Sequence, residues 1–204
     1  SRCTVFTGVN TLFAGLLAHP RIGEVDFSRL RMAAGGGSAI IEATSDKWAA
    51  ATGVFIREGY GLSETSPVVS FNTDQVKSFN GTTGVPLPST DVRLVTEDGR
   101  DAAPGEAGEV CVKGPQVMRG YWEKPQANAA AFTADGYFRT GDVGVFTAEG
   151  YLKIVDRKKD MIIVSGFNVF PNEVESVATA CPGVLECACV GVPDEKTGEA
   201  ARLF

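Results

Sequence analysis

Apolar side chains in residues 1–78 change repeatedly between helical and strand-like spacing. Positions three and four residues apart carry Leu12, Phe13, Leu16 and Leu17. This spacing predicts a helix whose first turn is capped by Asn10 or Thr11. The pattern then predicts a short strand around 30–32, a helix over 40–51 and a strand over 54–60. Alternating helices and strands with glycine-rich turns indicate a layered α/β segment.

From residue 79 to residue 155 the apolar runs become short and the turn signals become frequent. The runs lie at 92–95, 109–113 and 151–155, and Asp-Gly, Pro-Gly and Glu-Gly pairs separate them. Pro125 suits the first position of one short helix between them. The pattern predicts a β-rich subdomain with the character of a distorted barrel.

A dense charge cluster at residues 156–160, DRKKD, precedes a third pattern in residues 161–204. There a strand, a glycine turn and a helix are followed by a strand over 184–192 and the beginning of another at 200–204. The apolar face of that helix is predicted at Val174, Val177 and Ala178. We expect the start of a small α+β domain, with the charge cluster as either a linker or an ordinary solvated loop.

The composition is that of an ordinary globular protein, with 44% hydrophobic and 22% charged residues. The formal net charge of −6 predicts an acidic surface that repels phosphate backbones, so we expect no nucleic-acid partner. The longest apolar runs are too short to span a bilayer. Five cysteines without a Cys-x-x-Cys pair predict buried free thiols in a reducing cytosol.

Two glycine-rich stretches are candidates for ligand contact. Residues 79–88, FNGTTGVPLP, have the glycines and hydroxyls of a phosphate loop, but they have no lysine or arginine and contain two prolines. We therefore predict a turn there that leads into the next strand. The other stretch consists of Gly35, Gly36, Gly37 and Ser38. Its glycines would let a flat ligand approach the backbone, although a turn that enters a helix would have the same composition.

Two polar strand ends offer side chains that suit a nucleotide. EGYGLSET (58–65) supplies the ring of Tyr60, the hydroxyl of Ser63 and the carboxylate of Glu64. These groups suit base stacking, a hydrogen bond to phosphate and an oxygen ligand for Mg²⁺. The second strand end places Asp142 after a glycine turn, and a carboxylate that accepts two hydrogen bonds suits a ribose diol. Taken separately, either could equally be a polar strand end without a ligand.

Six stretches follow one another in an order that carries a family resemblance. They read GGGSAI (35–40), EGYGLSET (58–65), VKGPQVMRGYW (112–122), YFRTGD (137–142), VDRKKDMIIVSGFNVFPNEVE (155–175) and PGVLECACVGVPDEKTGEA (182–200). With them the chain resembles, along nearly all of its length, the adenylate-forming acyl-CoA synthetases. Among these it is most similar to the bacterial long-chain fatty-acid–CoA ligases.

The resemblance implies a reaction in two steps. A fatty-acid carboxylate attacks the α-phosphate of ATP with the help of Mg²⁺, which gives acyl-AMP and pyrophosphate. The thiol of coenzyme A then displaces AMP and forms the thioester. The implied cofactors are ATP, Mg²⁺ and coenzyme A, and the protein would contribute positioning and charge stabilisation. A cytoplasmic location is implied as well, with peripheral association with the inner membrane and the oligomeric state left open.

The resemblance also implies roles for single residues. The adenine and acyl pockets would be lined by Gly35, Gly36, Gly37 and Ser38. Tyr60, followed by Gly61, would stack on adenine, and Ser63 would contact the α-phosphate. Glu64 would hold Mg²⁺.

Four more residues receive roles in the same way. Asp142 would bind the ribose hydroxyls, and Arg157 would add a ribose or phosphate contact. Asp156 would be the hinge about which a small domain rotates between the half-reactions. Gly166 would line the pantetheine path, where the absence of a side chain lets a thin ligand pass.

The resemblance divides the chain into parts of a larger protein. The implied parts are the end of an α/β subdomain (1–78), a β-rich subdomain (79–155), a hinge (156–160) and the first part of a small C-terminal domain (161–204). The family's phosphate loop and its C-terminal catalytic lysine are expected outside these residues, so we expect this chain alone to be inactive.

Two other functions remain open at this point. An adenylating enzyme could load acyl groups onto the phosphopantetheine of a carrier protein in place of free coenzyme A. A non-catalytic binding module could keep the fold without the chemistry, although the presence of Glu64 and Asp142 argues against it.

Overall fold

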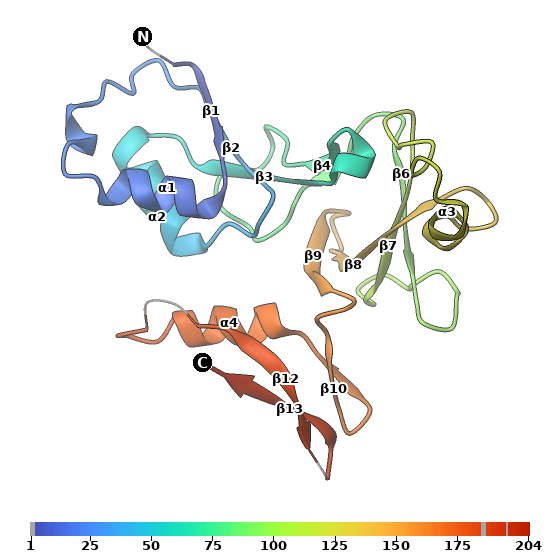
Figure 1. Ribbon diagram of the computed structural model, residues 1–204. Helices are drawn as coiled ribbons and strands as arrows, with labels where there is room; N and C mark the ends of the chain where they lie inside the picture. The colour runs from blue at the N-terminus through green and yellow to red at the C-terminus, as the bar shows by residue number, and fades with distance from the viewer. Residues whose placement is uncertain (1–2, 185–186, 195) are drawn as a thin grey trace.

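Three sheets carry the fold in the computed structural model, which describes residues 3–184, 187–194 and 196–204 (Figure 1). The first sheet has the strand order β1-β2-β3-β4-β5. Its strands are β1 (Val5–Gly8), β2 (Met32–Gly35), β3 (Ile56–Gly61), β4 (Val68–Phe71) and β5 (Val85–Pro86). Strands β1, β2 and β3 are parallel, and β4 and β5 add to them as antiparallel strands. This sheet confirms the predicted α/β segment.

Helices α1 (Asn10–Ala18) and α2 (Glu42–Thr52) pack against the parallel strands, and short 3₁₀ turns lie at η1 (Ile22–Glu24) and η2 (Ser63–Thr65). The core of this layer consists of Phe13, Leu30, Ala33, Ile40, Trp48 and Ile56. The ring of Trp48 meets that of Phe13 edge to face, with centroids 4.8 Å apart. The predicted apolar stripe faces this core through Phe13, Leu16 and Leu17, but it is wrong at Leu12, which is 44% exposed.

The predicted cap of α1 is wrong. Val9 occupies the N-cap position, and no side chain caps the helix. The side chain of Asn10 instead accepts a hydrogen bond from the backbone N–H of Ile41 at 3.0 Å, at the start of α2. The predicted end of α2 is confirmed, because Gly53 follows it in the left-handed conformation at φ +77°.

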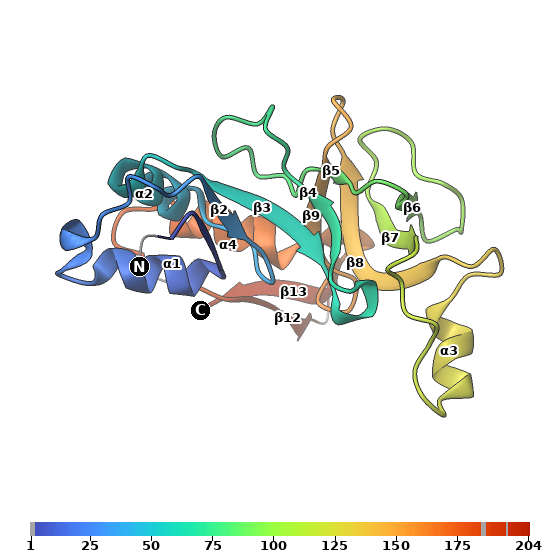
Figure 2. The same cartoon turned by 90° about the horizontal axis from the view of Figure 1, so that it is seen from above.

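The second sheet is antiparallel, with the order β6-β7-β8-β9. Its strands are β6 (Asp91–Val95), β7 (Gly108–Lys113), β8 (Phe138–Phe146) and β9 (Leu152–Arg157). Helix α3 (Pro125–Ala131) begins at the predicted proline and projects away from the sheet (Figure 2). Asp142 lies within β8 and not after a turn, because the strand continues through Gly141 at φ +75°.

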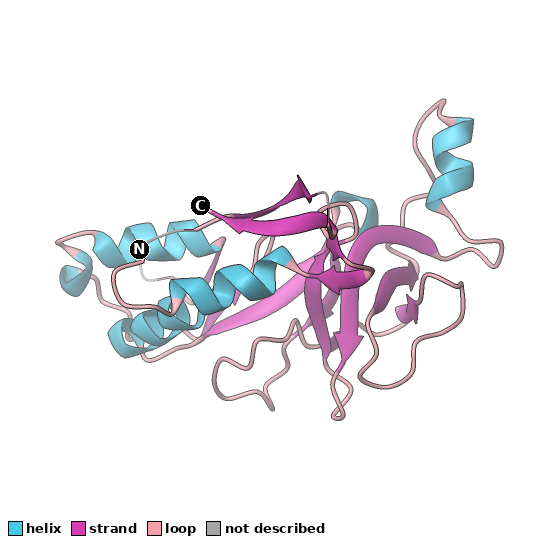
Figure 3. Cartoon of the chain, turned by 90° about the horizontal axis from the view of Figure 1, so that it is seen from below, coloured by secondary structure: helices cyan, strands magenta, loops and turns pink. Residues whose placement is uncertain are grey.

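The third sheet, with the order β11-β10-β13-β12, accompanies helix α4 (Figure 3). Its elements are β10 (Ile162–Val164), β11 (Phe167–Val169), α4 (Pro171–Thr179), β12 (Cys189–Asp194) and β13 (Gly198–Leu203). The strand predicted over 184–192 begins only at Cys189, and its residues 185–186 lie outside the described part of the chain. The predicted apolar face of α4 is wrong at Val177, whose side chain is 73% exposed.

The stretch FNGTTGVPLP connects the first two sheets. The backbone N–H of Thr83 donates to the carbonyl of Leu152, and the N–H of Leu152 donates to the carbonyl of Gly84, both at 2.7 Å. Val69 of β4 packs into the core of the second sheet beside Leu152. The predicted turn is confirmed, and its backbone groups hold β9 against the end of β5.

The structure also tests the expectations for the cysteines and for membrane-spanning segments. All five cysteines are free thiols, but the expected burial is confirmed only for Cys111 and Cys189, since Cys3 and Cys181 are exposed. Within the described residues, we find no helix with the length and apolar character needed to cross a bilayer.

Gly84 lies in the segment that connects the two sheets, and its close packing against β4 can be tested by substitution. A Cβ at Gly84 would lie 2.1 Å from the backbone carbonyl of Phe71, and φ is +85°. We expect Gly84→Ala to destabilise the protein by more than about 3 kcal/mol, because left-handed strain and a backbone clash add together. The matched variant Gly99→Ala has φ +84° but meets no atom within 4 Å, so it should lose only about 1–2 kcal/mol. Urea unfolding of both variants measures the difference, and equal losses would contradict the close packing of Gly84 against Phe71.

Candidate functional site

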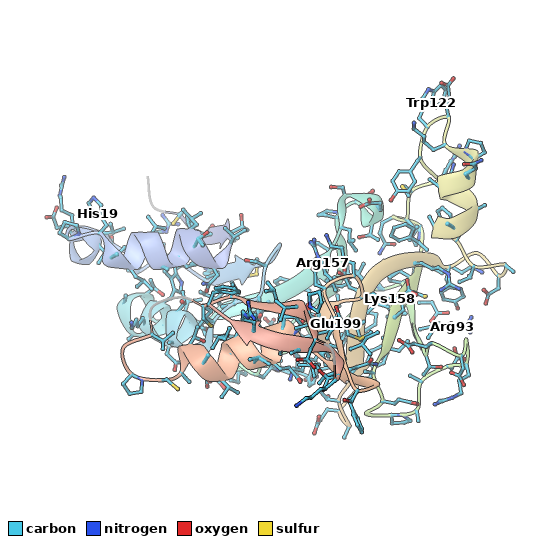
Figure 4. The ribbon with its side chains drawn as sticks, turned by 60° about the horizontal axis from the view of Figure 1, so that its bottom comes forward. His19, Arg93, Trp122, Arg157, Lys158 and Glu199 are labelled. Carbon is cyan, nitrogen blue, oxygen red and sulfur yellow. The ribbon has the colours of Figure 1, made fainter. Side chains whose placement is uncertain are left out.

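Tyr60 and Asp142 meet where the first two sheets join. The hydroxyl of Tyr60, on β3, donates to Oδ2 of Asp142, on β8, at 2.5 Å. Arg157 is the partner of Asp142 in the ladder between β8 and β9, and its Nε lies 3.8 Å from Oδ1. Figure 4 shows Arg157 in the middle of the molecule, near this junction. The fold thus brings together three of the residues that the sequence singled out.

The surroundings of Asp142 set its ionisation. Burial raises the pKa of its carboxyl group, while the hydrogen bond from Tyr60 and the charge of Arg157 act in the opposite direction. Burial, and then the charge of Asp142, raise the pKa of Tyr60 well above its ordinary value, so the hydroxyl keeps its proton and remains a donor. Oδ2 is engaged by this donor, and Oδ1 is left to accept another hydrogen bond.

The local conformation of β8 is fixed by Thr140. Its hydroxyl donates to the carbonyl of Val110 at 2.8 Å and accepts from the backbone N–H of Asp142 at 3.1 Å. The hydroxyl thus bonds both β7 and the strand that carries the carboxylate. The position of Asp142 therefore depends on the register of the second sheet.

The glycine-rich stretch after β2 has structural reasons for two of its glycines. A Cβ at Gly35 would lie 2.6 Å from Ile40, and a Cβ at Gly36 would lie 3.0 Å from the carbonyl of Gly59. Gly37 has φ +78° and, like Ser38, is exposed. Packing alone thus accounts for Gly35 and Gly36, while Gly37 and Ser38 leave an accessible backbone near β3.

Glu58 is a residue of this site that the sequence reasoning missed. Its side chain is buried, with 7% of the residue exposed, and Oε1 accepts a hydrogen bond from the N–H of Ile40 at 3.2 Å. Burial raises the pKa of Glu58 from 4.5 to about 7, against the effect of that hydrogen bond. Together with Asn10, which binds the N–H of Ile41, it holds the backbone of the two residues that precede α2. Only its burial, which needs the tertiary structure, distinguishes it from an ordinary strand glutamate.

Ser63 and Glu64 lie in the turn η2, which Thr65 holds in shape. The Thr65 hydroxyl donates to the carbonyl of Pro67 at 2.6 Å and accepts from the N–H of Leu62 at 3.0 Å. Gly61 lets the backbone at Pro67 pass close to the end of β3, because a Cβ at Gly61 would lie 1.7 Å from the Pro67 carbonyl oxygen. Ser63 is exposed and Glu64 partly exposed, so both side chains can be reached by a ligand.

The metal site implied by the resemblance fits Glu64. No group of three or more His, Cys, Asp or Glu side chains in the described residues could hold a metal ion alone. Mg²⁺ in nucleotide enzymes is commonly bound by one or two carboxylates together with the phosphates of the substrate. A single accessible carboxylate is therefore the donor set that such a site requires.

Asp156 lies beside this group, next to Arg157 and opposite Val143 in the ladder between β8 and β9. Asp156 is a buried residue of β9, and its carboxylate accepts from the N–H of Arg157 at 2.7 Å and from the N–H of Asn172 at 3.0 Å. It thus ties the end of β9 to the start of α4. Gly166 lies at φ +83° in the turn between β10 and β11, and no contact found among the described residues joins it to Tyr60 or Asp142.

A cavity of about 380 Å³ lies elsewhere, between the end of β9, α4 and β12. Two of the carboxylates in its wall already accept backbone hydrogen bonds, Glu175 from Cys189 at 2.7 Å and Glu199 from Ile163 at 2.8 Å. They are therefore structural groups, and the accessible polar side chains beside Tyr60 and Asp142 make the better candidate site.

Comparisons with known proteins give the chain its relatives. A family model described as AMP-binding enzyme matches residues 1–122, and one described as AMP-binding enzyme C-terminal domain matches residues 173–204. A long-chain-fatty-acid--CoA ligase of Salmonella typhimurium is 50% identical over 201 residues, which are 98% of this chain and 36% of that protein. The chain therefore spans about a third of the length of this curated relative.

Solved structures agree with these matches. ATP-bound MatB from Rhodopseudomonas palustris is 37% identical and superimposes with a TM-score of 0.92, covering 99% of this chain and 40% of MatB. The structure of apo MatB superimposes with a lower TM-score of 0.83. The anthranilate CoA ligase AuaEII in complex with anthranoyl-AMP gives 0.88 at 30% identity, covering 98% of this chain and 39% of AuaEII.

Glu58 predicts a specific dependence of stability on pH. The pKa of Glu58 is raised to about 7 in the folded protein, so its carboxyl group binds a proton more tightly there than in the unfolded chain. The stability that Glu58 contributes is therefore fully present below pH 4.5 and is lost as the pH rises through 7. Glu58→Gln, which mimics the protonated carboxyl, should therefore stabilise the protein at pH 8 and change little at pH 5, at about 1.4 kcal/mol per unit of pKa shift. Urea unfolding at both pH values measures this, with the exposed Glu97→Gln as control. The same change at both pH values would contradict it.

Proposed function

The chain belongs to the family of AMP-binding enzymes, and from this premise we propose that the whole protein is a long-chain fatty-acid–CoA ligase that forms acyl-AMP. The observation that carries the proposal is the group of Tyr60, Asp142 and Arg157 at the junction of two sheets, beside Glu64 and the exposed end of the glycine-rich stretch. The identity to the Salmonella ligase supports the fatty acid as substrate.

We propose that the nucleotide lies across this junction. The ring of Tyr60 stacks on adenine while its hydroxyl stays bonded to Asp142. Oδ1 of Asp142 accepts a ribose hydroxyl, and the guanidinium of Arg157, whose side chain is 62% exposed, contacts ribose or phosphate. Gly36, Gly37 and Ser38 would offer backbone to the nucleotide beside β3, and buried Gly35 supports them from β2, where it pairs with Glu58.

The first half-reaction joins an oxygen of the fatty-acid carboxylate to the α-phosphorus of ATP and breaks the bond to pyrophosphate. In the proposal Ser63 donates its hydroxyl to the α-phosphate, and Glu64 holds Mg²⁺. The bound cation would neutralise charge that develops on the phosphate oxygens. Since these groups sit on one turn held by Thr65, they act as one preorganised unit.

In the second half-reaction the thiol of coenzyme A attacks the acyl carbonyl, and AMP leaves with the bonding electrons. We propose free coenzyme A as the acceptor because the Salmonella relative is a CoA ligase. Gly166 would then line the path of the pantetheine arm, which requires the third sheet to approach the junction. ATP and coenzyme A as substrates also support a cytoplasmic location.

The hinge at Asp156 is part of the proposal. Asp156 belongs to β9 of the second sheet, and its carboxylate accepts a hydrogen bond from the start of α4, so it joins the second sheet to the part of the chain that would rotate. Two residues further on, Lys158 (Figure 4) donates to Oε2 of Glu109 of β7 at 3.2 Å. Arg139 donates to the same oxygen at 3.1 Å. The bond between Lys158 and Glu109 fastens the hinge to the second sheet. We propose that it stabilises the arrangement seen here, which matches ATP-bound MatB better than apo MatB.

The reaction itself is tested with the full-length protein. We expect AMP formation that depends on both palmitate and coenzyme A, and acyl-chain length should change its rate. Asp142→Asn should weaken ATP binding about tenfold or more, because a buried acceptor becomes partly a donor. Asp135→Asn, at an exposed carboxylate that pairs with Arg93, should have no effect.

Two results would contradict the ligase. Transfer to carrier-protein phosphopantetheine but not to coenzyme A would favour the carrier-loading enzyme. Binding of an acyl-AMP analogue without turnover would favour the non-catalytic module. The 204-residue chain should release no pyrophosphate from palmitate and ATP.

The hinge has its own test in the two half-reactions measured separately. Glu109→Gln removes the charge that Lys158 contacts, so the rate of acyl-AMP formation should fall relative to thioester formation from preformed acyl-AMP. A partly exposed ion pair of about 1 kcal/mol corresponds to a change in this ratio of about fivefold. Glu106→Gln is the matched control, because its carboxylate pairs with Arg100 in the loop between β6 and β7 and has no contact with Lys158 among the described residues. An unchanged ratio in Glu109→Gln would count against the fastening.

A further inference from the structure

The loop that follows β7 reaches back to the turn η2. The backbone N–H of Met118 donates to the carbonyl of Glu64 at 2.7 Å. Three residues further on, the hydroxyl of Tyr121 donates to Oε1 of Glu64 at 3.0 Å. One loop thus binds both the backbone and the carboxylate of a residue that lies 57 positions earlier than Tyr121.

Asn128 of α3 holds the backbone of Tyr121 in place. The N–H of Tyr121 donates to Oδ1 of Asn128 at 2.7 Å, and Nδ2 of Asn128 donates to the carbonyl of Tyr121 at 2.9 Å. Gly120, at φ +143°, lies so close that a Cβ there would be 2.9 Å from Oδ1 of Asn128. The paired hydrogen bonds and the missing side chain fix the direction in which the tyrosine leaves the loop.

We propose that Tyr121 is a positioning residue that orients the carboxylate of Glu64 for a divalent cation, and that Asn128 fixes Tyr121. The inference rests on the proposed function of Glu64 and deepens it. The phenol occupies one lone pair of Oε1 and leaves Oε2 free to face a cation. A carboxylate held in this way loses less freedom when the cation binds, as second-shell partners of metal ligands generally provide.

Two aromatic residues follow one another in this loop. The hydroxyl of Tyr121 donates to Oε1 of Glu64 at 3.0 Å. The neighbouring Trp122, 86% exposed, points away from the body of the protein (Figure 4). Of these two neighbouring aromatic residues, Tyr121 is therefore the one directed to Glu64, and Trp122 is not.

The test measures metal binding without turnover. Mn²⁺, a paramagnetic stand-in for Mg²⁺, is titrated into the full-length protein with a non-hydrolysable ATP analogue, and free Mn²⁺ is followed by electron paramagnetic resonance. Tyr121→Phe removes one oxygen and should weaken Mn²⁺ binding about tenfold. Affinity for the analogue in EDTA should not change, because in the proposal Tyr121 acts through the carboxylate of Glu64 and not on the nucleotide. Asn128→Ala should weaken Mn²⁺ binding in the same direction.

Tyr137→Phe is the matched control. The hydroxyl of Tyr137, just before β8, also donates to a carboxylate. Its acceptor is Asp91, at the start of β6, and not a residue of η2. This variant should keep the wild-type Mn²⁺ affinity. In the Glu64→Gln background, Tyr121→Phe should have no further effect, since the carboxylate it orients is gone.

Several outcomes would overturn the inference. They are an unchanged Mn²⁺ affinity in Tyr121→Phe, an equal loss in Tyr137→Phe, or an additive loss in the Glu64→Gln background. If these measurements come out as expected but the wild-type protein forms no acyl-CoA, the proposed function fails while the orienting role of Tyr121 stands. If the wild type forms acyl-CoA and Tyr121→Phe binds Mn²⁺ normally, only the inference fails.

Discussion

The candidate site depends on the junction between the parallel sheet and the antiparallel sheet. Backbone hydrogen bonds of 2.7 Å join Leu152 to Thr83 and Gly84, and Val69 is buried in the core of the second sheet. This packing brings the end of β3 to within a hydrogen bond of β8. Without it Tyr60 and Asp142, which are 82 positions apart, would have no reason to meet.

The residues around this junction are held by groups that contact no ligand. Glu58 binds the start of α2, Thr140 binds β7, and Thr65 shapes the turn of Glu64. Glu58 and Thr65 bind backbone groups beside the ends of a helix and a strand, and Thr140 binds the carbonyl of Val110 at the irregularity between β7 and β8. The backbone around the candidate site is thus stabilised by polar side-chain contacts.

The second sheet contacts both the candidate metal ligand and the proposed hinge. Its loop after β7 binds Glu64 through Tyr121, and Glu109 of β7 binds Lys158 beside the proposed hinge. The strand between these contacts is largely buried and cannot shift easily, because its neighbours on both sides fix its register. The contact of Lys158 with Glu109 and the loop that carries Tyr121 therefore both depend on the position of this one strand.

The sequence by itself determined the order of the elements, most helix and strand positions, and the residue types of the site. Periodicity and glycine or proline signals act over a few residues, so α1, α2, α3 and the strand before Gly61 could be predicted. Only the tertiary structure decided that Asn10 binds Ile41 and does not cap α1, and that Asp142 lies within a strand. It also decided the burial of Glu58 and the contact of Tyr121 with Glu64. These features arise from packing and register between distant segments, which no local pattern of side chains encodes.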